Sequence, residues 1–427
     1  MKKITMAVFL IAAMAFAPTA FGNGLNLNGL GTRAVTMGGA FVGLADDFSA
    51  LYWNPAGLGF IEKPTLGFNL LDVMPSASYR FSLVGGDQVA ADSPTKHYLG
   101  GLGGWIQPID DHLVAGIGIF TPSGLGSAWN PQDMASLSGG NRSIDWSSRI
   151  GVFTIAPTIA YKVNDSLSLG AQLNISYGFF NLNTYAGYIY LSSGTVIDLG
   201  QYEETLSGWG FGATLGVLYK PSDKISLGLT YRTAATIKFS GKANIFMFEY
   251  LGYSKESEIE RPVTWPSWLA AGVAVKPTDR LTITADVQFT NWKKLDVLET
   301  TYQDPFWSLL MTAAGNTERE LYWENKLQLR VGAEYVFCRD WAVRAGFYND
   351  PSPAPDRTMN ILLPSFGYSG LTLGFGRMAG NLQIDFGLEL LLGRERTIAA
   401  TAANAAAMPG VYGMTIVVPH FSVSHRF

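Results

Sequence analysis

Several stretches of this chain alternate apolar and polar residues with a period of two, and this alternation limits the folds open to it. Residues 225–231 read ISLGLTY, so that Ile, Leu, Leu and Tyr alternate with Ser, Gly and Thr. The same alternation recurs over residues 281–290, 326–337 and 382–390. Because successive side chains of a strand point to opposite faces, each stretch predicts a strand with one apolar and one polar face.

Composition narrows the kind of β-protein. Only 15% of residues are charged, against about a quarter in soluble proteins, while 13% are aromatic and 48 of 427 are glycine. After the first 22 residues, no apolar run reaches the roughly 18 residues of a membrane-spanning helix. The net charge of -4 gives no reason to expect nucleic acid, and the single cysteine, Cys338, excludes an internal disulfide framework. These features favour an outer-membrane β-barrel.

The N-terminus indicates export. Two lysines precede an apolar run over residues 4–17, and Ala20-Phe21-Gly22 places small residues where a signal peptidase cleaves. We expect a signal peptide over residues 1–22, with cleavage after Gly22. The alternative is a membrane anchor, but the run is short for a span of about 20 residues.

Strands and turns follow a regular plan. Short turns built on Asp with Pro or Asn join pairs of strands, as in YKPSDKISLGLTYR (219–232) and VKPTDRLTITADVQF (275–289). Much longer connections separate these hairpins, at about 73–97, 121–149, 179–205, 240–266, 294–321, 349–360 and 395–410. Short turns at one end and long loops at the other are typical of an outer-membrane barrel.

About fourteen strands can be counted, an even number as expected for a single-chain bacterial barrel. They are expected near 64–72, 98–107, 112–120, 150–163, 166–178, 206–220, 224–239, 266–276, 280–293, 322–337, 340–349, 361–377, 381–394 and 411–427. The alternative is a soluble β-sandwich with its apolar faces inward. Aromatic residues where interfacial girdles would lie favour the barrel, namely Tyr161, Tyr177, Tyr219, Tyr231, Trp292 and Tyr335.

The last strand ends HFSVSHRF, in which Phe421, Val423 and Phe427 alternate with polar residues up to a terminal aromatic. Chains handled by the barrel-assembly machinery end in this way, although His425 is less apolar than the pattern usually has. We therefore expect that machinery as a partner during biogenesis.

Residues 23–60 are neither a strand array nor a regular helix. They are rich in glycine, mildly apolar, and close on Asn54, Pro55, Ala56 and Gly57. A barrel of fourteen strands is wider than its own side chains can fill, since about eight strands already give a packed interior. An irregular backbone is acceptable inside a barrel, away from lipid. We therefore expect residues 23–60 to form a hatch that plugs a barrel of residues 61–427.

The hatch sequence GLGTRAVTMGGAFVGLADDFSALYWNPAGL resembles that of the FadL/TodX family of outer-membrane transporters, with the Asn-Pro-Ala element at 54–56. The resemblance implies a plugged fourteen-stranded barrel in the outer membrane of a Gram-negative bacterium. It implies transport of a hydrophobic small molecule, either a long-chain fatty acid or an aromatic hydrocarbon. Because the sequence has no ATP-binding motif, we expect this transport to be passive. Outer-membrane lipid and lipopolysaccharide would surround a protein that we expect to be a monomer.

The family also implies a kinked third strand that opens the wall sideways. Here HLVAGIGIFTP (112–122) carries Gly116 and Gly118 on the inward parity, followed by Phe120 and Pro122. Glycine within a strand weakens pairing and often marks a bulge. The alternative is ordinary barrel glycine.

A hydrophobic groove between the third and fourth outer loops is the second implied feature. These loops contain FFNLNTYAGYIYL (179–191) and ANIFMFEYLGY (243–253), which are very apolar for segments facing water. We expect a capture surface formed by Tyr188, Tyr190, Phe246, Phe248 and Tyr250. The alternative is an extended hairpin beyond the membrane in which Phe246, Phe248 and Tyr250 merely alternate.

Two further features belong to the loops and the strand below them. Asp304 and Pro305 predict the start of a short helix over 303–316, whose face of Phe306, Leu309 and Leu310 would cap the barrel or join the groove. Arg232 and Lys238 share the lumen-facing parity of one strand and are candidate partners for a carboxylate.

Other functions receive less support. The four histidines have no triad or metal-ligand spacing, and no GxSxG or phosphate-binding motif occurs, so we expect no catalytic residue, metal or cofactor. A general or anion-selective porin is the stronger rival, and a structural or adhesive barrel is a third possibility. The porin hypothesis rests on the charged residues of the lumen face, which are Arg232, Arg330, Arg344, Asp286, Glu334, Asp385 and Glu389. Alternatively, these charges pair across the lumen and hold the hatch.

Overall fold

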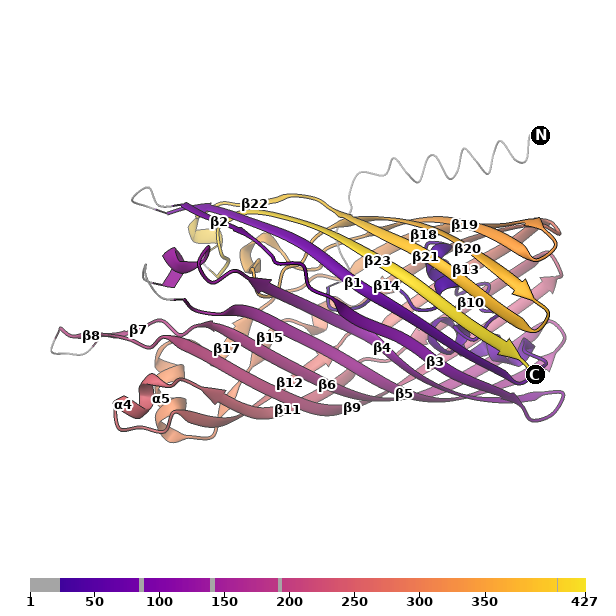
Figure 1. Ribbon diagram of the computed structural model, residues 1–427. Helices are drawn as coiled ribbons and strands as arrows, with labels where there is room; N and C mark the ends of the chain where they lie inside the picture. Colours follow the sequence, from indigo (N-terminus) through magenta and orange to yellow (C-terminus); the bar gives the residue numbers. More distant parts are fainter. Residues whose placement is uncertain (1–23, 84–87, 139–142, 191–193, 405) are drawn as a thin grey trace.

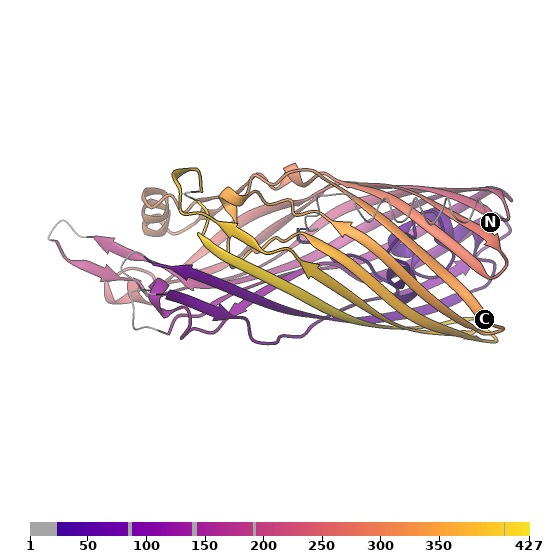
Figure 2. The same ribbon diagram turned by 90° about the horizontal axis from the view of Figure 1, so that it is seen from above.

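The chain forms a long, closed antiparallel β-barrel (Figures 1 and 2). A computed structural model describes residues 24–83, 88–138, 143–190, 194–404 and 406–427, so the expected signal peptide lies outside the described residues. Within them, the last strand, β23, pairs with β1 from Thr65↔Arg426 to Arg80↔Val411, which closes the wall. The predicted fourteen-stranded barrel is confirmed.

Two of the fourteen barrel strands are each interrupted once. In chain order the strands are β1 (Thr65–Ser82), β3 (Tyr98–Pro108), β4 (Leu113–Trp129), β5 (Trp146–Asn164), β6 (Leu167–Tyr185), β9 (Gln201–Ser222), β10 with β11 (Ile225–Arg232, Ala235–Asn244), β12 with β13 (Glu256–Trp265, Trp268–Thr278), β14 (Leu281–Thr290), β18 (Lys326–Cys338), β19 (Trp341–Asp350), β20 (Tyr368–Ala379), β21 (Leu382–Gly393) and β23 (Gly410–Arg426).

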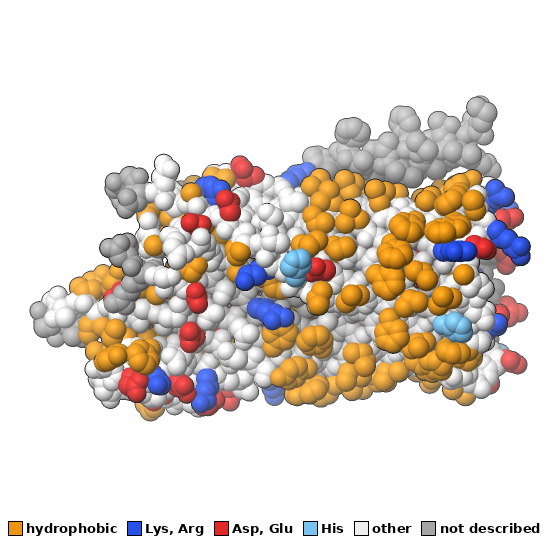
Figure 3. All heavy atoms as spheres, viewed as in Figure 1, with side chains coloured by type: hydrophobic (Ala, Val, Ile, Leu, Met, Phe, Trp, Pro, Cys, Tyr) orange, Lys and Arg blue, Asp and Glu red, His pale blue; other side chains and the backbone are white. Residues whose placement is uncertain are grey.

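The two faces of the wall follow the predicted alternation. Leu229 of β10 is 46% exposed on the outside, whereas its neighbour Thr230 is fully buried inside. Hydrophobic side chains gather over the half of the barrel nearer the short turns, with charged side chains at both ends (Figure 3). Trp292 is an exception to the expected girdle, because it is fully buried and packs on Trp323 inside the barrel.

Short turns close one end of the barrel, and their geometry explains the Asp and Asn found there. Asp110 Oδ1 accepts hydrogen bonds from the amides of His112 and Leu113, both 2.8 Å long. These bonds hold the pKa of the Asp110 carboxyl below its usual value. Asn164 accepts from Ser166 and Leu167 in the same way.

Smaller elements lie toward the other end, at the left of Figure 1. They are β2 (Gln88–Asp92), β7 (Tyr188–Tyr190), β8 (Val196–Asp198), β15 (Val297–Glu299), β16 (Thr301–Tyr302), β17 (Glu318–Glu320), β22 (Arg396–Ile398), α4 (Met247–Tyr250), α5 (Pro305–Ala313), and the 3-10 turns η2 (Ala135–Ser138), η3 (Trp292–Lys294), η4 (Asp356–Thr358) and η5 (Ala402–Asn404). Among the described residues, no helix is long and apolar enough to cross a membrane.

Helix α5 begins as predicted, but its buried face differs from the expected one. Asp304 caps its N-terminus by accepting from the amides of Phe306 and Trp307. Trp307 and Met311 are the buried residues, whereas Leu309 is 72% exposed. The helix therefore turns Trp307 and Met311, each one residue after an expected position, toward the neighbouring loops.

Strands run further beyond the apolar belt than the sequence pattern indicated. Strand β1 continues to Ser82 and β4 to Trp129, through stretches that we expected to be loops. Conversely, the expected strand 361–377 begins only at Tyr368. Outside the membrane the outward face need not be apolar, so alternation no longer marks the strand there.

Residues 24–60 lie inside the barrel, in the half near the short turns (Figure 2). This N-terminal segment contains α2 (Thr32–Thr36), α3 (Ala50–Trp53) and η1 (Pro55–Phe60), and most of its residues are buried. Its placement is the one expected of a hatch.

Candidate functional site

Close backbone contacts seat the N-terminal segment on the wall. Gly38 and Gly39 have φ values of 68° and 65°, which only glycine adopts readily. A Cβ on Gly38 would lie 2.4 Å from the carbonyl oxygen of Val331 in β18, so any larger residue would push the segment off the strand.

The Asn-Pro-Ala-Gly element is completely buried and acts as a second point of contact. Asn54 Nδ2 donates to the carbonyl oxygens of Val42 (3.0 Å) and Val217 (3.1 Å), while Oδ1 accepts from the amide of Ala56 (3.1 Å). One amide side chain thus joins two parts of the N-terminal segment to strand β9. Gly57 is equally constrained, because a Cβ there would lie 2.0 Å from the carbonyl oxygen of Ala45.

Charged residues of the lumen face form ion pairs and hydrogen bonds with each other and with the N-terminal segment. Glu334 pairs with Arg33 of the segment (2.8 Å) and with Arg344 (2.6 Å), and Arg344 continues to Asp385 (2.7 Å). Asp286 and Arg330 add bonds to the segment backbone: Asp286 accepts from the amide of Val42 (3.0 Å), and Arg330 donates to the carbonyl of Gly38 (3.1 Å). Glu334, Asp286 and Arg330 thus bind the segment to the wall.

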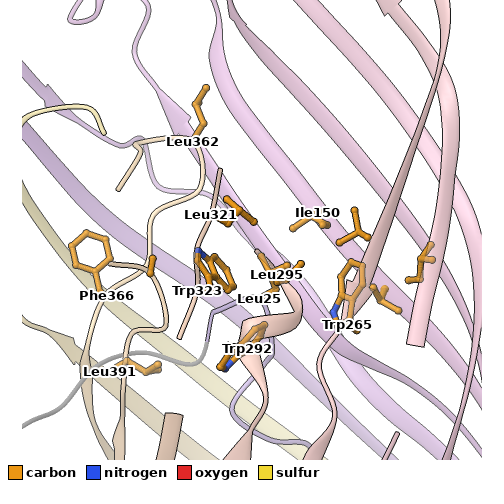
Figure 4. Packing of buried hydrophobic residues seen from close by; sticks show 14 of the residues in the cluster. Leu25, Ile150, Trp265, Trp292, Leu295, Leu321, Trp323, Leu362, Phe366 and Leu391 are labelled. Carbon is orange, nitrogen blue, oxygen red and sulfur yellow. The ribbon is translucent and has the colours of Figure 1, made fainter. Parts of the chain in front are cut away.

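Above the N-terminal segment, inward-folded loops pack apolar side chains into the lumen. Trp292, Trp323 and Leu295 gather around Leu25 at the start of the segment (Figure 4), with the two indole rings 5.2 Å apart. Arg261, whose Nη2 lies 3.0 Å from Glu204, borders an apolar cavity here. Sequence reasoning missed this ion pair, because its members lie in stretches that we expected to be loop or loop edge.

The two candidate partners for a carboxylate, Arg232 and Lys238, lie on opposite faces of the wall. Arg232 points inward, donates to the Tyr52 carbonyl (2.8 Å) and lies against the rings of Tyr52 and Trp268. Its buried Nε has no hydrogen-bond partner among the described residues. Lys238 is exposed on the outer face, and the expectation of a shared parity was wrong. The break between β10 and β11 shifts the alternation by one residue.

The third barrel strand, β4, is irregular, but not at the expected glycines. Gly116 and Gly118 pair regularly with both neighbouring strands, and a Cβ on either would meet Leu51 of the N-terminal segment. The ladder between β3 and β4 instead ends at Leu102↔Phe120, and the register between β4 and β5 shifts between Phe120 and Ser123. The two glycines make room for the segment, and the discontinuity starts at Phe120.

The start of the N-terminal segment fills the inner side of this discontinuity. The amide of Leu27 donates to the carbonyl of Pro122 (3.0 Å), and the amide of Gly124 donates to the carbonyl of Leu25 (3.1 Å). Ser123 Oγ lies 2.9 Å from Asn26 Oδ1. Backbone groups that β3 leaves unpaired are thus satisfied by the segment.

Two hollows meet where β3 and β4 separate. The inner one, about 1190 Å³ including its open part, lies between the N-terminal segment and the wall. The outer one, about 1140 Å³, is an apolar groove on the lipid-facing side of β1, β3 and β4. Both are lined by Leu99, Gly100, Thr121 and Phe153. We call the region between Gly101 and Thr121 the seam, where the amide of Gly101 donates to Thr121 Oγ1 (2.8 Å).

The expected capture residues divide into exposed and buried members. Tyr190, Phe246 and Tyr250 are 77%, 55% and 73% exposed, and Tyr188 is 41% exposed. Phe248 is fully buried against Phe306 and Trp307, so it supports the loop from within. Residues 247–250 form helix α4, which replaces the alternative of an extended hairpin.

The fold and interior define a plugged outer-membrane barrel: an apolar belt outside, a buried N-terminal segment inside, and a cavity that reaches the wall. The chain belongs to the outer membrane protein transport protein family (OMPP1/FadL/TodX), whose family model matches residues 8–422. The resemblance seen in the hatch sequence is therefore confirmed, as is an outer-membrane location.

Curated relatives are distant but extensive in coverage. The long-chain fatty acid transport protein of Escherichia coli K12 is 23% identical over 441 residues, covering 92% of this chain and 91% of that protein. Outer membrane protein P1 of Haemophilus influenzae is 22% identical over 356 residues, covering 73% of each chain.

Solved structures share the fold. A FadL homologue of Pseudomonas aeruginosa has a TM-score of 0.77 at 19% identity, covering 95% of this chain and 100% of that one. The Pseudomonas putida toluene transporter TodX has a TM-score of 0.71 at 18% identity, covering 94% and 99%.

Proposed function

We propose that this protein is a passive outer-membrane transporter of hydrophobic molecules and that its cargo is long-chain fatty acids. Membership of the transport family and the names of the curated relatives support transport. The inward Arg232, with an unpartnered Nε at a cavity edge, favours a cargo that carries a carboxylate. Aromatic hydrocarbons are the second candidate, since a toluene transporter shares the fold.

The proposed route begins at the loops and ends in the membrane. Exposed aromatics of β7 and α4 capture the ligand by burying its chain, worth about 0.8 kcal/mol per CH₂. The ligand then enters the inner hollow, and movement of the N-terminal segment frees the path to the seam. It leaves sideways between β3 and β4 into the apolar groove. A porin is disfavoured because the lumen charges are engaged with each other and with the segment.

The meeting of the two hollows at the seam is the observation that carries this route. An apolar ligand crossing there never has to enter bulk water, because the outer groove is bordered by lipid-facing side chains such as Leu99 and Phe153, which are 69% and 49% exposed. Gly100, Gly101 and Gly103 of β3 place no side chain in this part of the wall.

A disulfide across the seam tests the route. A Cβ on Gly100 would lie 2.7 Å from Thr121 Oγ1, so side chains at these two positions meet, as a disulfide with its Cβ atoms about 3.5–4.5 Å apart requires. Gly100→Cys with Thr121→Cys, in a Cys338→Ser background, should oxidise and join β3 to β4. Uptake of labelled palmitate by cells should be lost on oxidation and restored by reductant, whereas uptake by either single-cysteine variant should not respond to oxidant. Full uptake with the disulfide formed would reject a lateral exit here.

Cargo identity needs a separate measurement. Lipid extracted from the purified barrel should contain long-chain fatty acids by mass spectrometry, and Arg232→Met should reduce binding of palmitate more than binding of toluene. Preferred retention of toluene by the parent protein would favour the aromatic-hydrocarbon alternative.

A further inference from the structure

Tyr98 occupies the gap that the seam leaves in the wall. It is the first residue of β3 and lies beyond the last β3–β4 pair, Leu102↔Phe120, where the two strands have separated. Its half-buried side chain lines the inner hollow together with Gly126 of β4 and Arg149 of β5. Its ring therefore lies where a ladder would otherwise close the barrel.

Gly126 is the notch that receives this ring. A Cβ added to Gly126 would lie 2.3 Å from Tyr98 Cζ and 2.5 Å from its hydroxyl oxygen. Such distances are far inside van der Waals contact, so the ring can lie there only because residue 126 has no side chain. Gly126 pairs with Arg149 on β5, and both belong to the outward parity of their strands.

Gly124 shows that the notch is specific to one position. It lies two residues earlier on the same face of β4, yet a Cβ there would meet nothing nearer than the carbonyl oxygen of Ile150 at 3.9 Å. Of these two glycines on one face of β4, only Gly126 holds the Tyr98 ring.

We propose that Tyr98 is the door of the lateral exit and that Gly126 is the seat that lets it close. This inference rests on the proposed lateral route and adds a specific closing residue to it. In the structure the ring lies on Gly126, next in the chain to Leu99 and Gly100, which line both hollows. A ligand leaving through the seam displaces the ring, which then returns to the glycine and restores the barrier.

The door predicts opposite behaviour for the two glycines. Gly126→Ala should displace the Tyr98 ring and leave the exit partly open, and Tyr98→Ala should remove the ring. Each should accelerate palmitate uptake roughly fivefold, equivalent to about 1 kcal/mol in the closed-to-open equilibrium at 1.4 kcal/mol per tenfold. Gly124→Ala and Tyr98→Phe should behave as the parent, since one site is open and the other variant keeps the ring.

Initial uptake rates should be measured for these four variants at matched, heat-resistant barrel levels, alone and combined with the seam cysteines. If oxidation of the seam cysteines abolishes the fast uptake of Tyr98→Ala, Tyr98 controls passage through the seam. If the seam disulfide blocks uptake while Tyr98→Ala and Gly126→Ala match Gly124→Ala, the door is rejected and the exit stands. If the disulfide has no effect, the exit itself fails, and the door with it.

Discussion

Replacing Asn54 by alanine should loosen the N-terminal segment without unfolding the barrel. The side chain makes three hydrogen bonds, two as donor to Val42 and Val217 and one as acceptor from Ala56. It is completely buried, so no water replaces a lost partner directly. The bond to Val217 joins the segment to the wall, while the other two hold the segment's own bend.

The magnitude follows from the bond to Val217, because it is the one of the three that breaks when the segment leaves the wall. Such a bond contributes about 0.5–1.5 kcal/mol net. At 1.4 kcal/mol per tenfold, its loss shifts the seated-to-released equilibrium of the segment by roughly two- to tenfold. The barrel ladders are untouched, so heat-resistant mobility on gels should not change.

Planar-bilayer recording measures this shift. Asn54→Ala should show frequent conducting openings where the parent is nearly silent, and cells carrying it should become sensitive to large hydrophilic antibiotics. Asn174→Ala is the matched control, because that buried lumen amide donates to Thr214 of the wall rather than to the segment. Equal conductance of Asn54→Ala and Asn174→Ala in folded barrels would refute the reasoning.

Three further predictions follow from the contacts of the interior and the loops. Gly116→Val with Gly118→Val should abolish selective palmitate uptake and raise conductance, because both side chains press on the N-terminal segment; loss of uptake without added leak would argue for a wall effect instead. Phe246→Ser should weaken palmitate binding by roughly tenfold with little salt dependence, whereas Phe248→Ser should chiefly expose the loop to limited proteolysis, since truncating a buried Phe costs about 3–5 kcal/mol. Arg344→Met removes the cation that pairs with the buried Asp385 and leaves Glu334 with Arg33 alone; it should destabilise the barrel by about 3–5 kcal/mol in urea unfolding, and an unchanged midpoint would contradict that role.

Much of the fold was predictable because the membrane imposes a simple rule on the sequence. Outward positions such as Leu229 must be apolar, so the alternation marks each strand where it crosses the lipid. Beyond the lipid the rule lapses, and β1 and β4 run on unnoticed through polar sequence. Trp292 was misplaced for a related reason: an aromatic at a strand end fits either a girdle or a packed lumen, and only the surrounding loops decide.

Individual site residues were harder to predict because they depend on register. The break after Arg232 turns Lys238 outward, and no local residue pattern announces such a shift. Phe248 and Phe246 are two residues apart in one apolar loop, yet a single helical turn buries the first and exposes the second. The glycines of β4 show the same ambiguity, because a glycine that admits a neighbouring segment looks identical in sequence to one that breaks a ladder.

The seam and the N-terminal segment are linked, because backbone groups of β4 at the seam find their hydrogen-bond partners in the segment. Where β3 leaves β4, the backbone of β4 around Pro122 and Gly124 would have unpaired groups, and proline has no amide to offer a neighbouring strand. Leu25 and Leu27 of the segment supply those partners. A shift of the segment therefore exposes polar backbone at the seam, while formation of a regular β3–β4 ladder would compete with the segment for the same groups. On the proposed lateral route, a ligand that displaces the segment's first residues would therefore also loosen the wall through which it leaves.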